Sequence, residues 1–184
     1  MCIRDSPKGV FNLVTGDGTT GSELVNHEGI SKIAFTGSTS VGKYIQNAVG
    51  ERDIGLTLEL GGKAANIVYN DAALDQAVEG VVNGIFFNQG HVCCAGSRLL
   101  LQEDIHDEFI NKLEKRMQTL RVGNPLDKNT DIGAINSKEQ LEKITSLVNE
   151  GVNDGGELFQ IECDLPSSGS VSYTHLTLPT TSPV

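Results

Sequence analysis

The chain has 184 residues and a formal net charge of -10, a length that suits one domain of ordinary size or parts of two. The negative charge argues against a nucleic acid partner, because phosphate binding needs a surplus of Lys and Arg, although backbone N–H groups could still hold a phosphate-bearing cofactor. No apolar run approaches the roughly 20 residues of a membrane span, no secretory signal is visible, and the 4 cysteines make no disulfide framework, so we expect a cytoplasmic α/β protein with reduced thiols and no membrane partner.

The two ends differ in character from the rest of the chain. Residues 1–6 (MCIRDS) show no periodicity, and residues 170–184 shift abruptly to Thr, Ser and Pro. Both ends resemble sequencing-adapter read-through, so we expect a non-native leader and a non-native tail and leave them outside the fold. Cys2 and His175 therefore receive no role.

Residues 7–62 alternate short apolar runs with helical patterns. Strands are predicted at residues 10–15, 33–36 and 56–60, and helices at 19–26 and after the turn at 37–42. On the second helix, Val41, Ile45 and either Ala48 or Val49 share one face. This alternation of strand and helix is typical of a parallel, doubly wound sheet.

A second unit, residues 63–169, begins after the glycine pair near residues 61–63. A strand at 64–69 is followed by a helix, which Asn70 or Asp71 can cap. Apolar residues recur at helical spacing and form one continuous core stripe: Leu74, Ala77, Val78, Val81, Val82, Ile85 and Phe86. The stripe leads the chain to Gly90 and an adjacent pair of cysteines.

The rest of this unit has a strand at 99–101 and two helices joined by a long polar loop at 123–136. The first of these helices has an apolar face made of Ile105, Phe109, Leu113 and Met117. Ser137 and Gln140 form a capping box. It opens the last helix, which carries Leu141, Ile144 and Val148.

The turn at residues 37–42 follows a strand and opens a helix, so its N–H groups and the helix dipole favour an anion. With Lys43 the segment GSTSVGK fits a nucleotide-triphosphate loop, but that loop next needs Ser or Thr to hold Mg²⁺, and Tyr44 stands there. A dinucleotide pyrophosphate site is the second interpretation, although the spacing departs from G-x-G-x-x-G. A plain structural turn fits the pattern equally well.

Glu59 lies on the apolar strand LTLEL. Charged groups are rarely buried without a partner, so its carboxyl either faces a cleft at the strand end or pairs with Lys63. A half-buried carboxyl at a sheet edge would have a raised pKa and could act as a general base.

Cys93 and Cys94 lie in a loop of small residues, within FFNQGHVCCAGSR (86–98). A thiol there can be a nucleophile that faces a cleft, or an inert cysteine that packs like a small hydrophobe. A metal site with His91 is a third interpretation. Adjacent cysteines cannot easily share a tetrahedral ion, and no second pair is present, so we expect no metal. Spacing alone does not decide which thiol is reactive.

Taken in order and separation, FTGSTSVGK, LELGGK and FFNQGHVCCAGSR resemble the NAD(P)-dependent aldehyde dehydrogenase superfamily. The resemblance runs from about residue 7 to about residue 169. It implies a Rossmann-like parallel sheet, here the second half of an NAD(P)-binding domain (7–62), followed by part of an α/β catalytic domain (63–169). It also implies a full-length protein that is a homo-oligomer.

By position, the resemblance implies that Cys93 is the catalytic nucleophile and that Glu59 is the general base for water. Cys94 matches a variable neighbour, which we expect to be packed. One departure is visible: the family has Gln or Glu directly after the glycine of the cysteine loop, and this chain has His91.

The resemblance also implies a set of cofactor-binding positions. Gly37 and Ser38 match the turn that lies against the cofactor pyrophosphate. Gly18 matches a glycine near the adenosine end. Leu60 and Gly61 match residues that line the nicotinamide side.

The implied reaction is the oxidation of a small-molecule aldehyde to a carboxylic acid with NAD or NADP, through a thiohemiacetal and a thioester on Cys93. The Cys93 N–H is one candidate oxyanion donor. The family's second oxyanion donor and its ribose-binding residues fall outside this chain, so we expect a fragment that is inactive or poorly active alone. A cysteine-dependent esterase and a non-catalytic scaffold are the alternatives on the same fold.

Overall fold

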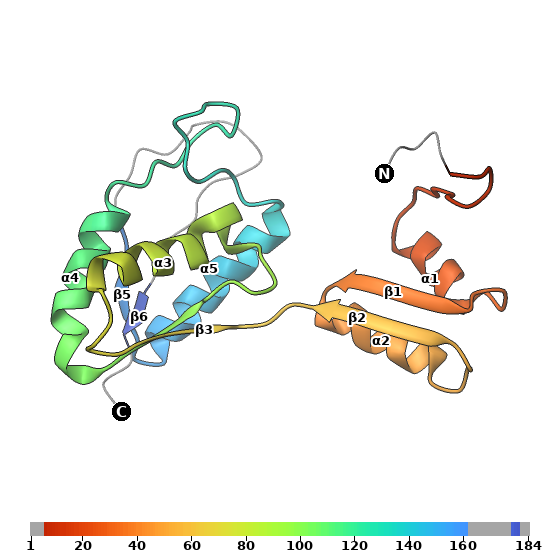
Figure 1. Cartoon of the computed structure of the whole chain (residues 1–184), viewed down its shortest axis with the longest axis horizontal. Helices are drawn as coiled ribbons and strands as arrows, with labels where there is room; N and C mark the ends of the chain where they lie inside the picture. The colour runs from red at the N-terminus through yellow and green to blue at the C-terminus, as the bar shows by residue number, and fades with distance from the viewer. Residues whose placement is uncertain (1–5, 162–177, 181–184) are drawn as a thin grey trace. The chain divides into compact units, whose positions relative to one another are not determined.

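The computed structural model describes residues 6–161 and 178–180, so Cys2 and His175 lie outside the described residues. The chain divides into two compact units, residues 1–61 and 62–184, and each has an apolar core of its own (Figure 1). In the described part of the chain, no helix is long and apolar enough to cross a membrane.

The first unit is built on two parallel strands packed against a helix. The elements run in the order α1 (Gly18–Asn26), β1 (Lys32–Gly37), α2 (Thr39–Val49) and β2 (Gly55–Leu60), and β1 pairs with β2 in parallel. Alternate strand residues face the helices, because successive side chains of a strand point to opposite faces. The core contains Val25, Ile45 and Val49, with Ile33, Phe35, Leu56 and Leu58 packed against it. The expected strand–helix–strand unit is confirmed.

The prediction of a strand at residues 10–15 is wrong. These residues have no regular secondary structure, and their large apolar side chains are more than half exposed: Val10, Phe11, Leu13 and Val14. A strand satisfies its backbone N–H and C=O groups only through a neighbouring strand. No strand among the described residues pairs with this segment.

The buried face of α2 is shifted by one residue from the predicted face. Ile45 and Val49 are buried as expected, but Val41 is 42% exposed. Gly42 takes the buried position in its place. The i, i+3, i+7 spacing of these buried residues keeps them on one side of the helix, and the missing side chain at Gly42 leaves room for Leu60 of β2.

The second unit repeats the strand–helix–strand arrangement. β3 (Ala65–Val68) leads through α3 (Leu74–Phe86) and a short 3₁₀ segment, η2 (Phe87–Gly90), to β4 (Arg98–Leu101). β3 and β4 pair in parallel. A second short turn, η3 (Glu103–Ile105), enters α4 (His106–Met117), and α3 and α4 pack side by side over the sheet (Figure 1).

The core of this unit confirms both predicted apolar stripes. Val78, Val81 and Val82 of α3 meet Phe109, Leu113 and Met117 of α4, with Val68 of β3. Phe109 is 0% exposed. The cap expected at Asn70 or Asp71 is wrong, since the helix begins at Leu74 and its N-cap, Ala73, makes no side-chain bond. Asn70 instead donates to Asp104 at 2.8 Å.

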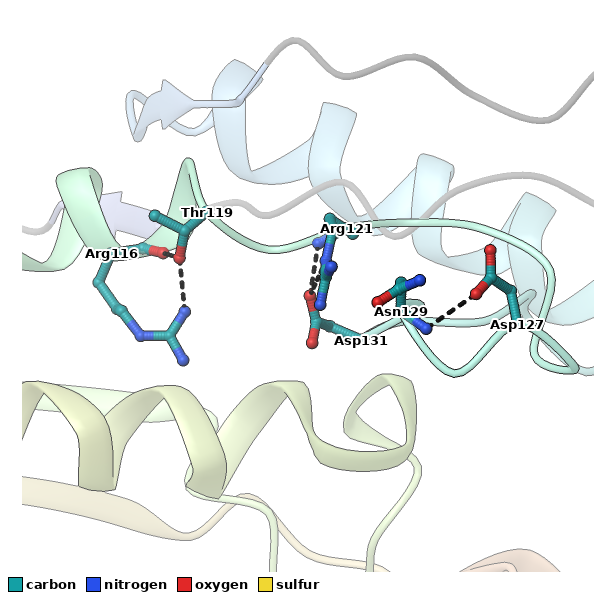
Figure 2. A network of polar contacts seen from close by, with 6 residues as sticks. All are labelled: Arg116, Thr119, Arg121, Asp127, Asn129 and Asp131. Carbon is teal, nitrogen blue, oxygen red and sulfur yellow. Dashed lines mark hydrogen bonds and ion pairs between the residues drawn. The ribbon is translucent and has the colours of Figure 1, made fainter.

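The loop that follows α4 is not uniformly polar. Ile132 and Ile135 are 1% and 2% exposed, and a parallel bridge joins Val122 to Ile132. Arg121 and Asp131 form an ion pair of 3.2 Å in this loop (Figure 2). The two buried isoleucines fix the loop against its domain.

The chain ends in a long helix and a small strand pair. α5 (Lys138–Asn153) starts at the predicted cap, where the Ser137 hydroxyl accepts from the Gln140 N–H at 3.1 Å. β5 (Glu157–Phe159) then pairs antiparallel with β6 (Leu178–Thr180). β6 belongs to the segment that the sequence analysis leaves outside the fold.

Candidate active site

The paired thiols occupy the two central positions of a tight turn. The turn is closed by a hydrogen bond of 3.0 Å from the Ala95 N–H to the Val92 carbonyl. Cys93 and Cys94 therefore sit at its tip, and both are free and exposed. The N–H of Cys93 makes no hydrogen bond within the part of the chain that the structure describes, so it is available to an incoming acceptor.

The expectation that Cys94 is packed is wrong. Both thiols are exposed, and the buried residue of the loop is the next one, Ala95, at 7% exposure. Side chains at the two central positions of a β-turn project away from the chain that the turn joins. The anchor of the loop is therefore alanine, and neither thiol serves as its core contact.

The turn is fixed on its C-terminal side by α3 and β3. The Gly96 N–H donates to the Gly84 carbonyl in α3 at 3.0 Å, and the Asn66 side chain donates to the Gly96 carbonyl at 2.9 Å. A Cβ at Gly96 would clash with the Asn66 amide. Asn66 was not among the predicted site residues, although a single Asn within an otherwise apolar strand is a signal that could have found it.

The turn is approached through strained backbone. Asn88 and Gln89 have φ values of 50° and 54°, and Gly90 has a φ of 74°. Non-glycine residues rarely adopt this left-handed region, and such strain gathers at functional sites. At Gly90 a Cβ would also lie 3.1 Å from the Ile85 carbonyl, so this position requires glycine.

Glu59 is the penultimate residue of β2, opposite Thr36 of β1. It is exposed, and so is not half-buried within its own unit. The pairing with Lys63 is absent among the described residues, because the Lys63 ammonium donates to the Gly62 carbonyl at 3.3 Å. The Glu59 side chain is thus left free for another role.

The N-terminus of α2 suits an anion. Ser38 is its N-cap, where the hydroxyl oxygen accepts from the Val41 N–H at 3.3 Å and lies 3.1 Å from the Ser40 hydroxyl. No acidic residue stands in the first turn. A Cβ at Gly37 would lie 2.5 Å from the Phe35 ring, so the chain passes there without a side chain. A neutral cap, free N–H groups and the helix dipole together match a pyrophosphate.

The N-terminus of α1 suits an anion much less well. Asp17 caps this helix and accepts from the Thr19 N–H at 2.9 Å. The backbone N–H groups of Thr19 and Thr20, followed by the Thr19 hydroxyl, hold the pKa of the Asp17 carboxyl below its ordinary value. A carboxylate already fills that helix end, so Gly18 beside it fits an uncharged part of a cofactor better than its phosphates.

The remaining positions surround the end of β2. Leu60 is half-buried, and a Cβ on Gly42 of α2 would lie 2.7 Å from it. Gly61 is exposed, with open space around it. In the second unit, a Cβ on Gly62 would lie 3.7 Å from the Cys93 carbonyl, so Gly62 lies close to the cysteine turn.

Tyr44, which replaces the hydroxyl ligand of a nucleotide-triphosphate loop, has a structural partner. Its hydroxyl lies 2.6 Å from the Ser22 hydroxyl and accepts from the Asn26 side chain at 3.1 Å. These bonds, the one to Ser22 first, lower the pKa of Tyr44. Tyr44 thus joins α2 to α1.

Within residues 6–161 and 178–180, no three side chains of His, Cys, Asp or Glu lie close enough together to hold a metal ion.

Comparison with known proteins places these features in one family. The sequence model of the aldehyde dehydrogenase family matches residues 2–173. A curated relative, an aldehyde dehydrogenase-like protein of Schizosaccharomyces pombe, is 47% identical over 154 residues, which are 83% of this chain and 31% of the relative. The chain belongs to the aldehyde dehydrogenase family, as the three motifs indicated.

Solved structures agree with this assignment. The NAD-dependent aldehyde dehydrogenase of Sinorhizobium meliloti matches with a TM-score of 0.81 and 38% identity over 85% of this chain and 32% of its own. Betaine aldehyde dehydrogenase of Staphylococcus aureus, solved in complex with NAD⁺, matches with a TM-score of 0.80 and 35% identity over 84% of this chain and 31% of its own. The α/β fold with parallel sheets is therefore confirmed, and the chain spans about a third of the length of these relatives.

Proposed function

We propose that the chain is the nucleophile-bearing part of a longer enzyme that oxidises an aldehyde to a carboxylic acid with NAD or NADP. The observation that carries the proposal is the Cys93 turn, with its exposed thiol and unpaired backbone N–H. Family membership and the N-terminus of α2, which has a serine cap and no acidic residue in its first turn, support it. The exposed pair of thiols also favours a reducing compartment such as the cytoplasm.

Cys93 begins the reaction as a thiolate. Its sulfur adds to the aldehyde carbon, a C–S bond forms, and the carbonyl oxygen becomes an oxyanion. The Cys93 N–H can donate to that oxygen, because no other acceptor among the described residues uses it. A rigid turn keeps this donor in place as the negative charge develops.

The nicotinamide cofactor, when bound, supplies the oxidant that takes the hydride from this carbon and leaves a thioester on Cys93. Gly37 and Ser38 would hold its pyrophosphate, Gly18 would lie near the adenosine, and Leu60 and Gly61 would line the nicotinamide side. The donor set fits, because the cap at Ser38 is neutral whereas the cap at Asp17 is charged.

Glu59 completes the cycle as a general base. It takes a proton from water, the water oxygen attacks the thioester carbon, and the C–S bond breaks to return the Cys93 thiolate. The Glu59 side chain is exposed, so water can reach it.

A pair of matched variants tests the proposal in the full-length protein. Cys93→Ser should abolish aldehyde-dependent NADH formation, whereas Cys94→Ser, at the neighbouring position of the same turn, should leave most of it. Loss of activity in Cys94→Ser with retention in Cys93→Ser would reverse the assignment. The 184-residue chain by itself should form little or no NADH.

Two alternatives predict other results. A cysteine-dependent esterase releases its product without NADH. A scaffold gives no product, and its Cys93 reacts with iodoacetamide no faster than an ordinary thiol at neutral pH. The family resemblance also predicts a homo-oligomer, which sedimentation of the full-length protein would measure.

A further inference from the structure

The loop between α4 and α5 is held to its unit more tightly than a simple connection requires. Ile132 and Ile135 are almost fully buried. The Gly123 N–H donates to the Ile132 carbonyl at 3.0 Å, and the N–H groups of Asp131 and Ile132 both donate to the Arg121 carbonyl, at 2.9 and 3.0 Å. The Arg121 N–H and Nε–H in turn donate to the Asp131 carboxylate at 2.9 and 3.2 Å (Figure 2). The loop is therefore a rigid support.

Gly133 lies between the two buried isoleucines and meets the side chain of Gln89. The Gly133 N–H donates to the Gln89 amide oxygen at 2.9 Å, and the Gln89 amide nitrogen donates to the Asn88 carbonyl at 2.8 Å. The hydrogen-bond network selects this amide orientation, because the opposite one would set N–H against N–H. A Cβ on Gly133 would come within 2.7 Å of the Gln89 amide, so the contact depends on glycine.

Gln89 lies at the start of the path to the cysteine turn. Its own φ of 54° and that of Asn88, 50°, are unfavourable for residues with side chains. Strain of this kind persists only where the surrounding structure enforces it. The Gln89 amide makes a long-range contact that can do so. Closer to the thiols along the chain, the His91 N–H donates to the Asn88 carbonyl at 2.9 Å.

We propose that Gln89 is a positioning residue: clamped by Gly133, it fixes the backbone of residues 88–96 and with it the place of the Cys93 sulfur. The α4–α5 loop thereby supports the nucleophile through Gly133, which stands at position 133 in the sequence whereas Gln89 stands at position 89. Where it concerns turnover, this inference rests on the proposed function. Where it concerns the backbone, it stands on the contacts alone.

Two substitutions break the clamp while leaving the core intact. Gly133→Ala puts a methyl group against the flexible end of the Gln89 side chain, which can move aside. Gln89→Leu keeps similar bulk but removes the acceptor. Gly151→Ala is the matched control, because a Cβ there meets nothing within 4 Å and the residue lies in α5.

Hydrogen exchange of the 184-residue chain gives the first measurement. In both clamp variants the amides of His91, Ala95 and Gly96 should exchange at least tenfold faster, because their bonds open with the loosened backbone. The core amides of α4 should not change, and Gly151→Ala should match the wild type. Protection of residues 91–96 that stays within twofold of wild type in both variants would overturn the proposal.

Kinetics of the full-length enzyme give the second measurement. Displacing a nucleophile lowers the rate of chemistry, so kcat should fall about tenfold or more while KM for aldehyde and cofactor changes less than twofold. A fall in the thermal midpoint large enough to account for the whole loss of kcat would deny Gln89 a positioning role. Faster exchange at residues 91–96 with an unchanged kcat would deny it as well. Failure of the proposed function itself would show separately, as aldehyde oxidation that survives Cys93→Ser.

Discussion

Asn66 and Gly96 are joined by a hydrogen bond of 2.9 Å from the Asn66 side-chain amide to the Gly96 carbonyl, across 30 residues of sequence. This bond ties β3 to the loop that carries the thiols. Together with the bond from the Gly96 N–H to the Gly84 carbonyl, it satisfies both backbone groups of Gly96. The cysteine turn is thus held by the core of its own unit.

Asn66→Ala should destabilise the chain by about 1–1.5 kcal/mol, because the part-buried Gly96 carbonyl loses its partner. Urea unfolding would measure the change. Asn83→Ala is the control, since Asn83 is exposed on α3, and it should shift the free energy of unfolding by no more than about 0.5 kcal/mol. Equal effects of the two substitutions would show that the bond contributes nothing.

Glu59→Gln should separate the two halves of the proposed reaction. A glutamine cannot accept the proton of water, so thioester hydrolysis should slow by about 100-fold. The first turnover should persist as a burst of NADH in stopped flow. Glu51→Gln, at another exposed carboxylate of the same unit, should leave both phases unchanged. Loss of the burst together with steady turnover would place Glu59 before the thioester.

Phe109→Ala should be one of the most damaging substitutions in the chain. Phe109 is 0% exposed at the contact of α3 and α4, and emptying such a site costs about 3–5 kcal/mol. Phe87→Ala removes the same atoms from a side chain that is 72% exposed. It should change the free energy of unfolding by at most about 0.5 kcal/mol. Similar unfolding midpoints for the two variants would contradict the arrangement of the core.

Acid should loosen the loop after α4 through Asp131. The Arg121 N–H, followed by the Arg121 side chain, holds the pKa of Asp131 below its ordinary value of 3.8. A lowered pKa in the folded state stabilises the fold fully above that ordinary value, and the stabilisation is lost as the pH falls through the lowered pKa. Because the side chain is 38% exposed, solvent screens the effect, and we expect a modest one.

Urea midpoints measured from pH 5 to pH 2 would test this behaviour. Asp131→Asn should lower the midpoint at pH 5 and flatten its decline in acid. Asp127→Asn, in the same loop but bonded to the Asn129 N–H, should retain the decline. An acid dependence identical in Asp131→Asn and the wild type would exclude Asp131 as its source.

Much of the fold follows from local pattern. The stripes at Val78, Val81 and Val82 and at Phe109, Leu113 and Met117 are buried as predicted, because helical spacing places such residues on one face wherever the helix lies. The same holds for the two parallel strand pairs. Residues 10–15 show the limit of this reasoning, since an apolar run becomes a strand only beside a partner strand.

The candidate site was predicted as a set of residue types and then altered in its details. The loop pattern singled out the pair of thiols, and the family resemblance alone chose Cys93, whose role stays a prediction that the matched variants can test. The packed state expected of Cys94 was wrong, because exposure depends on how a turn is oriented. Gln89 and Gly133 were not singled out, since their contact joins two loops that share no sequence periodicity.

By itself, then, the sequence determined the alternation of strands and helices, their apolar faces, and membership of the aldehyde dehydrogenase family. Those properties depend on neighbours within a few residues or on short motifs. Only the tertiary structure decided that both thiols are exposed, that Asn66 holds Gly96, and that Gly133 meets Gln89. Each of these depends on chain segments that approach one another only after the core has packed, a geometry that no local pattern encodes.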